Sequence, residues 1–306
     1  IRLIFDRQIK IVQVSPSLIP VPLIRDAILI IIAKILGKKV VVFYRGWKLP
    51  IYYKVLESNI LRKLFNFIFQ KNTLQVVLAS SFKNDLENLE PKNEANIFVT
   101  TTAIDKSEIV RPEGTFDSNV INVLFLGRIQ DLKGIEELIE AIITLNNTNL
   151  LDKYRFTIVG HENRTGYIEE LKEKLRRNNV QNQIVSFPGR VTGREKFSLY
   201  AKNDVYVLPS YTEGCPNSLL EALASGVFCI TTKVGALADL IIPKKNGLFV
   251  EVKKSDTIVE ALKYCNLNKE YNESRVENSA YYCSEFDIRK ITHLFQTKYI
   301  ELIEKG

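Results

Sequence analysis

Two glutamates with seven residues between them flank a short turn in the segment PSYTEGCPNSLLEALASG, residues 209–226. Glu213 follows the apolar strand pattern DVYVLP, and Glu221 falls in a helix that Pro216 can open. A site that binds hydroxyl groups at the end of a strand needs such carboxylates, whereas a surface helix does not. In the alternative interpretation, Glu213 is only a carboxylate before a helix, where the helix dipole stabilises negative charge, and Glu221 is an exposed helix residue.

A second segment, FLGRIQDLKGIEELIEAI, combines two glycines with two cations. Gly127 lets the backbone turn after a strand, Arg128 and Lys133 bring positive charge into the loop, and Gly134 precedes a helix N-terminus that favours anions. This arrangement suits a diphosphate, although two solvated bases would give the same pattern. The segment matches neither GxxxxGK[ST] nor GxGxxG.

Apolar runs of strand length alternate with helical patterns and position these residues. The first series has strands at 10–15, 39–44, 74–80 and 96–100, with helices at about 22–36 and 51–70 and a short helix before the last strand. After a polar linker at 104–119, the second has strands at 122–127, 155–160, 183–189, 204–209 and 227–232, with helices at 135–146, 166–178, 193–202 and 216–225. We therefore predict an α/β protein with two doubly wound parallel sheets, followed by mostly helical chain after Asp256 and an amphipathic helix from 287.

Three predicted strands of the second series end in loops that carry chemistry. These loops are 127–134, 160–163 and 209–217. Because ligands of open α/β sheets bind at the carboxyl ends of strands, we expect the three loops to converge.

Composition places the chain among ordinary globular proteins. With 306 residues and 46% apolar composition, two domains are favoured over one. The four cysteines form no CxxC pair, so we expect reduced, buried thiols in a cytoplasmic protein. The apolar run AILIIIA is too short to span a bilayer, and the first residues do not resemble a secretory signal. The sequence lacks methionine, so we expect it to be part of a longer gene product.

Positive charge is concentrated in the first 83 residues, which carry 14 Lys and Arg against 3 Asp and Glu. Such a surface suits an anionic lipid, a phosphorylated substrate or a nucleic acid, or is simply a solvated face. No basic motif interleaved with aromatic residues is present, so we do not expect a nucleic-acid partner. The helical pattern LIRDAILIIIAKIL is expected to pack inside the protein and not to serve as an anchor.

Taken together, these segments resemble the retaining GT-B glycosyltransferases of the glycosyltransferase group 1, glycogen-synthase-like family. Glu213 and Glu221 stand at the family's E-x7-E spacing, and the segments GREKFSLYAKNDVYVLPSYTEG and GVFCITTKVGALADLI match the family's approach to the first Glu and the part after the second. The resemblance covers about 120–304, and more weakly 10–105. It implies a nucleoside diphosphate sugar donor, UDP-linked in preference to GDP-linked, and neither a metal nor a cofactor.

The resemblance also implies roles for individual residues. Arg128 and Lys133 would stabilise the leaving diphosphate, and Glu213 would lie at the donor sugar, so these three are the catalytic candidates. Glu221 would accept hydrogen bonds from the ribose. The remaining donor-binding candidates are Gly127, His161, Gly214, Cys215, Asn217 and Ser218. His161 either touches the base or is a polar loop residue, and His293 is expected to be structural.

Two departures concern the acceptor side. No glycine-rich loop precedes KIVQVSPS, so we expect an incomplete or naturally short N-terminal domain. Where the family often has a His beside Gly, this chain has Arg45, which cannot be a general base; it suits a phosphate or acidic acceptor, and Trp47 could stack on a sugar or belong to the rim or core. The domains expected are a partial acceptor-side domain at 1–110, a donor domain at 116–286, and a helix at 287–306 that crosses back to the first.

The function expected from these features is sugar transfer to a saccharide or lipid-linked acceptor in the synthesis of a cell-surface polysaccharide or glycolipid. We expect the protein in the cytoplasm, held at the inner face of an anionic membrane by its basic part. The alternative is a catalytically incomplete nucleotide-sugar-binding subunit that needs a partner chain. A nucleotide-sugar epimerase is less favoured, because no suitable acid and base can be placed.

Overall fold

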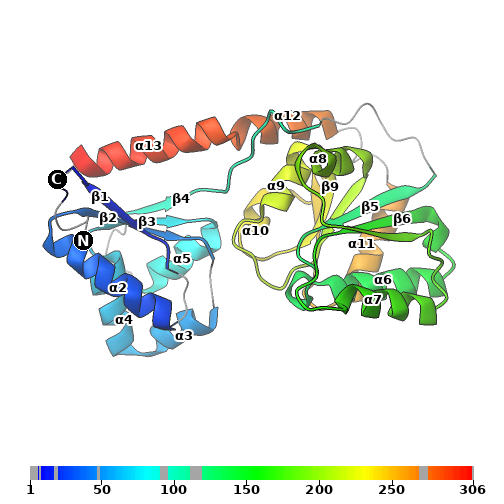
Figure 1. Cartoon of the computed structure of the whole chain (residues 1–306), viewed down its shortest axis with the longest axis horizontal. Helices are drawn as coiled ribbons and strands as arrows, with labels where there is room; N and C mark the ends of the chain where they lie inside the picture. Colours follow the sequence, from blue (N-terminus) through cyan, green and yellow to red (C-terminus); the bar gives the residue numbers. More distant parts are fainter. Residues whose placement is uncertain are drawn as a thin grey trace. The chain divides into compact units, whose positions relative to one another are not determined.

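The computed structural model describes residues 6, 8–16, 20–46, 49–89, 96–110, 119–268 and 275–304. Contacts divide the chain into two compact units. The N-terminal unit comprises Ile1–Thr102, Glu213–Cys215 and Arg289–Gly306, and the central unit comprises Ala103–Thr212 and Pro216–Ile288. Each contains a parallel sheet with interleaved helices (Figure 1), which confirms the predicted α/β class with two sheets.

The sheet of the N-terminal unit has the strand order β1-β2-β3-β4, and all its pairs are parallel. Its strands are β1 (Ile11–Val14), β2 (Lys39–Tyr44), β3 (Thr73–Val77) and β4 (Ile97–Val99). Its helices before the linker are α2 (Pro20–Ile35), α3 (Leu49–Glu57), α4 (Asn59–Phe65), the π-helix η1 (Asn66–Gln70) and α5 (Ser80–Leu89). The apolar runs of β2 and β3 are almost completely buried, as expected for strands covered on both faces.

The prediction of one helix at about 51–70 is wrong in its extent, because this segment forms three shorter helices, α3, α4 and η1. The chain breaks at Ser58, whose side chain accepts a hydrogen bond from the backbone N–H of Leu61 and so caps α4. The helical geometry then widens into η1 before β3 begins.

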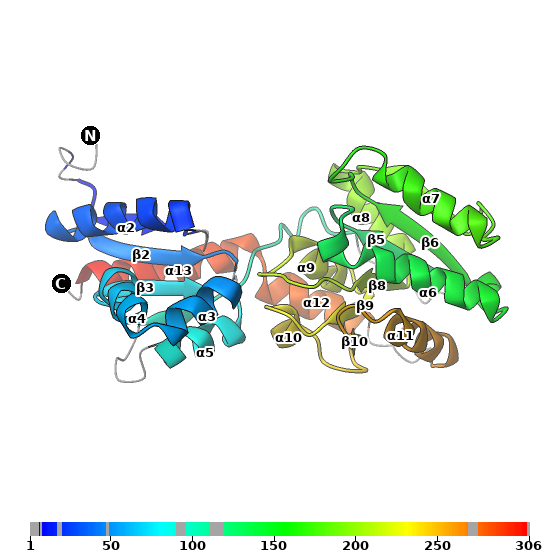
Figure 2. The ribbon, with the colours of Figure 1, turned by 90° about the horizontal axis from the view of Figure 1, so that it is seen from below.

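The last helix, α13 (Ile288–Glu304), covers one face of the N-terminal sheet. Its side chains Phe295, Tyr299 and Leu302 pack against the buried cluster of Val41, Leu74 and Val76. The other helices of this unit, including α2, α4 and α5, lie on the opposite face of the sheet (Figures 1 and 2). Both faces of this sheet are therefore covered, one of them by the C-terminal helix.

The expectation that the apolar residues of α2 pack inside the protein is wrong for one side of the helix. Ile30 and Ala33 are fully buried, but Val21, Ile28 and Ile35 are 77%, 53% and 78% exposed. Apolar residues occur on several sides of this helix, and only one side can meet the sheet, so the remaining apolar side chains face solvent.

The central unit contains a six-stranded parallel sheet with the order β10-β9-β8-β5-β6-β7. Its strands are β5 (Ile121–Leu126), β6 (Tyr154–Val159), β7 (Val185–Gly189), β8 (Val205–Leu208), β9 (Phe228–Thr232) and β10 (Gly247–Val250). The strand order reverses at β5, which pairs with β6 on one side and β8 on the other. This reversal is the topological switch point at which open α/β sheets bind ligands.

Helices connect these strands and cover the sheet of the central unit (Figure 2). They are α6 (Ile135–Asn147), α7 (Tyr167–Arg177), α8 (Gly193–Lys202), α9 (Asn217–Ala224), α10 (Leu237–Leu240), α11 (Ser255–Leu267) and α12 (Arg275–Glu285), with short 3-10 turns η2 (Asp131–Lys133) and η3 (Leu151–Lys153). Sequence analysis missed β10 and α10, which have only four residues each. Within the described ranges, no helix combines the length and the apolar character needed to cross a bilayer.

Candidate functional site

The loops that follow β5 and β6 lie in direct contact. The backbone N–H of Ile129 donates to the carbonyl of His161 at 2.9 Å. A Cβ added at Gly160 would lie 1.8 Å from the carbonyl oxygen of Gly127, and Gly160 has a φ of 153°, so only glycine fits there. The two loops therefore form one surface at the carboxyl edge of the sheet.

The loop after β8 closes on the same surface. Gly134 has a left-handed φ of 71°, and an added Cβ would lie 2.1 Å from the carbonyl oxygen of Pro209. The backbone N–H of Tyr211 also donates to the carbonyl of Leu132 at 2.9 Å. The expected convergence of the three loops is thus confirmed for the parts that belong to the central unit.

Two cations lie on this surface. Arg128 is exposed two residues after the end of β5, and Lys133 is half-buried as the last residue of η2, immediately before Gly134 and α6. Both side chains come from a loop whose backbone is held on two sides by the contacts of Gly127 and Gly134. The arrangement can stabilise negative charge on a bound phosphate.

Carboxylates near the start of α6 are held by tyrosines from neighbouring elements. The Tyr167 hydroxyl lies 2.5 Å from Oδ1 of Asp131 and 2.9 Å from Oε1 of Glu136, and the Tyr211 hydroxyl donates to Glu137. Burial, followed by these hydrogen bonds, raises the pKa of Tyr167 well above its ordinary value. The tyrosines stay protonated and act as donors, so they fix the carboxylates beside the cationic loop.

Glu221 has two partners that sequence analysis did not identify. The Lys196 amine lies 2.8 Å from its Oε1, and the Tyr200 hydroxyl donates to its Oε2 at 3.1 Å. Burial, then the nearby Tyr206 and Glu221, raises the pKa of Tyr200, which therefore remains a donor. Lys196 and Tyr200 are four residues apart on α8, so they share one face of that helix. This spacing is the signal that could have identified them.

The N-terminus of α9 is tied to the end of β5. The Tyr206 hydroxyl lies 2.8 Å from Oγ of Ser218 and 3.1 Å from the carbonyl oxygen of Leu126, the residue before Gly127. Asn217 is the first residue of α9 and is exposed, and no side chain caps this helix. The Ser218 hydroxyl is thus a structural contact, and the first backbone N–H groups of α9, which have no side-chain cap, are of the kind that suits an anion or a hydroxyl.

The other candidate residues belong to the N-terminal unit or lie outside the described residues. Glu213 and Gly214 are half-buried and Cys215 is buried in the loop between β8 and α9, and their contacts group these three with the N-terminal unit. Arg45 follows β2 in the same unit and is exposed, with its guanidinium 5.5 Å from the Phe43 ring centroid. Trp47 lies outside the described residues.

The two histidines sit in different settings. His161 is exposed in the loop after β6, in contact with the Arg128 loop through its backbone. His293 is an exposed residue of α13, where its carbonyl accepts a hydrogen bond from Thr297. Only His161 therefore lies beside the candidate site.

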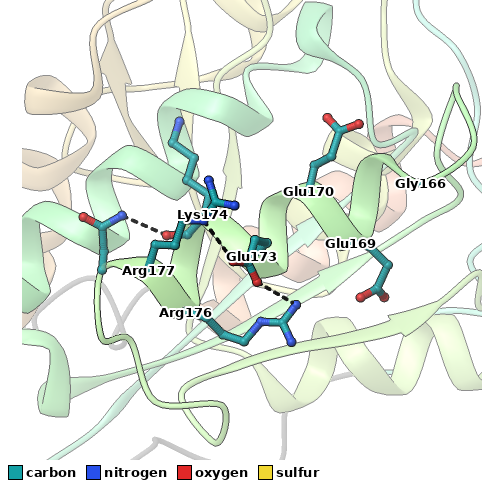
Figure 3. A pocket seen from close by; sticks show the side chains of 8 residues that line it. Gly166, Glu169, Glu170, Glu173, Lys174, Arg176 and Arg177 are labelled. Atoms are coloured by element: carbon teal, nitrogen blue, oxygen red, sulfur yellow. Dashed lines mark hydrogen bonds and ion pairs between the residues drawn. The ribbon is translucent and has the colours of Figure 1, made fainter.

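Two further features bear on what the protein can bind. Among the described residues, no group of three or more His, Cys, Asp or Glu side chains could hold a metal ion. A pocket along α7 is lined by Gly166, Glu169, Glu170, Glu173, Lys174, Arg176, Arg177 and Asn178 (Figure 3). Its charged side chains form ion pairs, such as Glu173 with Arg176 at 3.1 Å and with Arg177 at 2.9 Å, and Lys174 with Glu136 of α6 at 2.9 Å, so it is an ion-paired helix surface. It contains none of the predicted site residues.

Comparison with known proteins gives a consistent result. The family model described as glycosyl transferases group 1 matches residues 106–281. An uncharacterized glycosyltransferase of Methanocaldococcus jannaschii is 28% identical over 238 residues, which are 72% of this chain and 59% of the relative. The chain thus spans less than two thirds of the length of this curated relative.

Solved structures show the same fold at low sequence identity. Sucrose-phosphate synthase from Thermosynechococcus elongatus matches with a TM-score of 0.74 and 16% identity, covering 98% of this chain and 75% of the other. The Anabaena protein HepE in complex with UDP and glucose matches with a TM-score of 0.72 and 16% identity, covering 95% and 78%. These similarities confirm the predicted GT-B fold.

Proposed function

Because the chain belongs to the glycosyl transferases group 1 family, we propose that it transfers a sugar from a nucleoside diphosphate sugar to a saccharide or lipid-linked acceptor, with retention of configuration. The observation that carries the proposal is the meeting of the cationic loop of Arg128 and Lys133 with the N-terminus of α9 at the switch point of the central sheet. The complex of HepE with UDP and glucose supports UDP as the nucleotide.

In the proposed reaction, the bond between the anomeric carbon and the diphosphate oxygen breaks, and its electron pair leaves with the diphosphate. The acceptor oxygen forms the new bond to that carbon, and its proton is released. Negative charge therefore grows on the diphosphate, where Arg128 and Lys133 would stabilise it without a metal ion. The two cations contribute to turnover because they bind the transition state better than the donor.

Donor binding involves the other predicted residues. Glu221, oriented by Lys196 and Tyr200, would accept hydrogen bonds from the ribose. His161, whose carbonyl contacts the Arg128 loop, would contact the base. Asn217 and Ser218 would offer backbone N–H groups, while Glu213, with Gly214 and Cys215, would face the donor sugar. Arg45 and Trp47 are assigned to the acceptor side.

The acceptor is proposed to belong to cell-surface polysaccharide or glycolipid synthesis at the cytoplasmic face of an anionic membrane. The excess of positive charge in residues 1–83 supports this location. Each Lys or Arg close to such a surface contributes about 1 kcal/mol, so several together hold a protein reversibly.

The test combines binding and turnover. Isothermal titration with UDP, and the thermal midpoint with millimolar UDP, GDP or their sugars, measure donor binding; donor hydrolysis and transfer by the isolated chain measure turnover. We expect both. Failure of all nucleotides to raise the midpoint would refute the donor assignment, and binding without turnover would favour a nucleotide-sugar-binding subunit that needs a partner chain.

A further inference from the structure

Two helical segments of the N-terminal unit carry stripes of exposed apolar side chains. On α2 the stripe consists of Val21, Ile24, Ile28, Ile31 and Ile35, which are 39–78% exposed. On α4 and η1 it consists of Ile60, Leu64 and Phe67, which are 51–80% exposed. Spacings of three and four residues place each set on one side of its helix. These eight residues form the apolar face of this unit.

A single lysine joins the two stripes. The amine of Lys34, in the last turn of α2, donates to the carbonyl oxygens of Phe67, Ile68 and Lys71 at 3.2, 2.8 and 2.7 Å. The end of α2 is thereby fixed against η1, and both views show α2 and α4 on the face of the sheet opposite α13 (Figures 1 and 2). The two stripes therefore belong to one surface of this unit.

The charged residues of these two segments are almost all positive. Residues 20–36 and 59–71 contain Arg25, Lys34, Arg62, Lys63 and Lys71, and their single acid is Asp26. Asp26 is only 3% exposed and pairs with Arg25 at 2.7 Å. The two segments thus present apolar side chains and cations to solvent, with no exposed carboxylate.

The combination of exposed apolar side chains and cations favours one kind of partner over another. A second copy docked through the same face would bring cations against cations, which opposes a symmetric dimer. An anionic bilayer complements both properties, because apolar side chains enter the acyl boundary while Lys and Arg meet the phosphate headgroups. We propose that the apolar face docks on the surface of an anionic bilayer and inserts its side chains into the interface. This deepens the proposed function, on which it rests for the lipid-linked acceptor.

Insertion differs measurably from attachment by charge alone. Attraction between exposed cations and headgroups is screened by salt, whereas apolar insertion is not. We therefore expect binding to anionic vesicles that decreases with salt but retains a salt-resistant part.

The experiment is flotation of the full chain with vesicles of equal parts phosphatidylcholine and phosphatidylglycerol, and with vesicles of phosphatidylcholine alone. The double variant Ile28→Ser, Ile35→Ser should lower the partition coefficient at least tenfold and remove the salt-resistant part. The variant Lys63→Gln, Lys71→Gln should lower it about tenfold at low salt only. The matched control Leu267→Ser, Val276→Ser changes residues that are 79% and 62% exposed in the central unit, and it should bind like the parent.

A second readout follows the face itself. All four cysteines are buried, so Ile28→Cys can be labelled selectively with a polarity-sensitive fluorophore. Anionic vesicles should shift its emission to the blue. An unshifted probe, parent-like binding of the serine variant, or a dimer that this variant dissociates would each overturn the proposal. The vesicles contain neither donor nor acceptor, so these outcomes are independent of UDP binding and sugar transfer, which are measured separately.

Discussion

Lys196→Met tests the donor site through the contact that orients Glu221. The Lys196 amine lies 2.8 Å from Oε1 of Glu221, and the two side chains are 22% and 14% exposed. A hydrogen bond to a charged group contributes about 1.5–3 kcal/mol, and the remaining contact with water favours the lower value. Methionine keeps an unbranched side chain but removes the charge. Of the two partners of Glu221, only Tyr200 then remains. A carboxylate without its cation binds a nucleotide diphosphate less well, so we expect the Kd for UDP to rise about tenfold.

The assay is isothermal titration with UDP, together with donor kinetics and circular dichroism to verify folding. KM for the donor should rise while kcat changes little, because Lys196 acts through Glu221 and not on the leaving group. Lys202→Met is the matched control, since Lys202 is an exposed residue at the end of the same helix. If folded Lys196→Met bound UDP like the parent, the assignment of Glu221 to the ribose would be refuted.

Three other perturbations test catalysis, core structure and pH dependence. Arg128→Ala and Lys133→Ala should each lower kcat by about 10² to 10³ with folding intact, because each removes a donor that acts on the leaving diphosphate; equal turnover would reject that role. Arg275 is 2% exposed and donates to the carbonyls of Gly226 and Asn203 beside Asp204, so Arg275→Met should lower the free energy of unfolding by about 3–5 kcal/mol in urea titrations, and a loss near zero would contradict this. Backbone N–H groups of Ile168 and Gly166 lower the pKa of Glu162 below its ordinary 4.5, so unfolding takes up a proton and the stabilisation is lost as the pH falls below that value; Glu162→Gln should make Tm less dependent on pH there, as calorimetry can show.

Most of the central sheet was predictable because its strands are apolar runs separated by helices with clear periodicity. Strand β5 and helix α6, for example, follow directly from the sequence of residues 121–147. Helix α10 has only four residues, about one turn, which is too short to show a helical period. Strand β10 is as short as β8 but is only half-buried at its two central residues, and it was not recognised. The break before α4 had a local signal in Ser58, but the apolar pattern continues across it and concealed the cap.

For the candidate site, sequence analysis predicted which loops meet but not which side chains hold them. Gly134 and Gly160 were needed for close approach between loops, a requirement that only the fold makes visible. The spacing of Lys196 and Tyr200 shows that they share one face of α8, but Glu221 lies 25 positions after Lys196 on another helix, so their pairing is visible only in the fold. The exposed side of α2 was missed for a related reason. The pattern of apolar residues shows that a helix is apolar, but it does not show how much of its surface packs against other elements.

The two helix N-termini at the switch point differ in what they can offer an anion. The first turn of α6 contains Glu136 and Glu137, which already complement the positive end of its dipole, and Gly134 caps it without a side-chain bond. The first turn of α9 contains no acidic residue and has no side-chain cap. Phosphate oxygens should therefore meet the backbone N–H groups of α9, while the loop before α6 contributes through Arg128 and Lys133. On this argument the tyrosines that hold the α6 carboxylates matter for binding as well as for packing, because they restrict negative side chains that would otherwise compete with the diphosphate for the two cations.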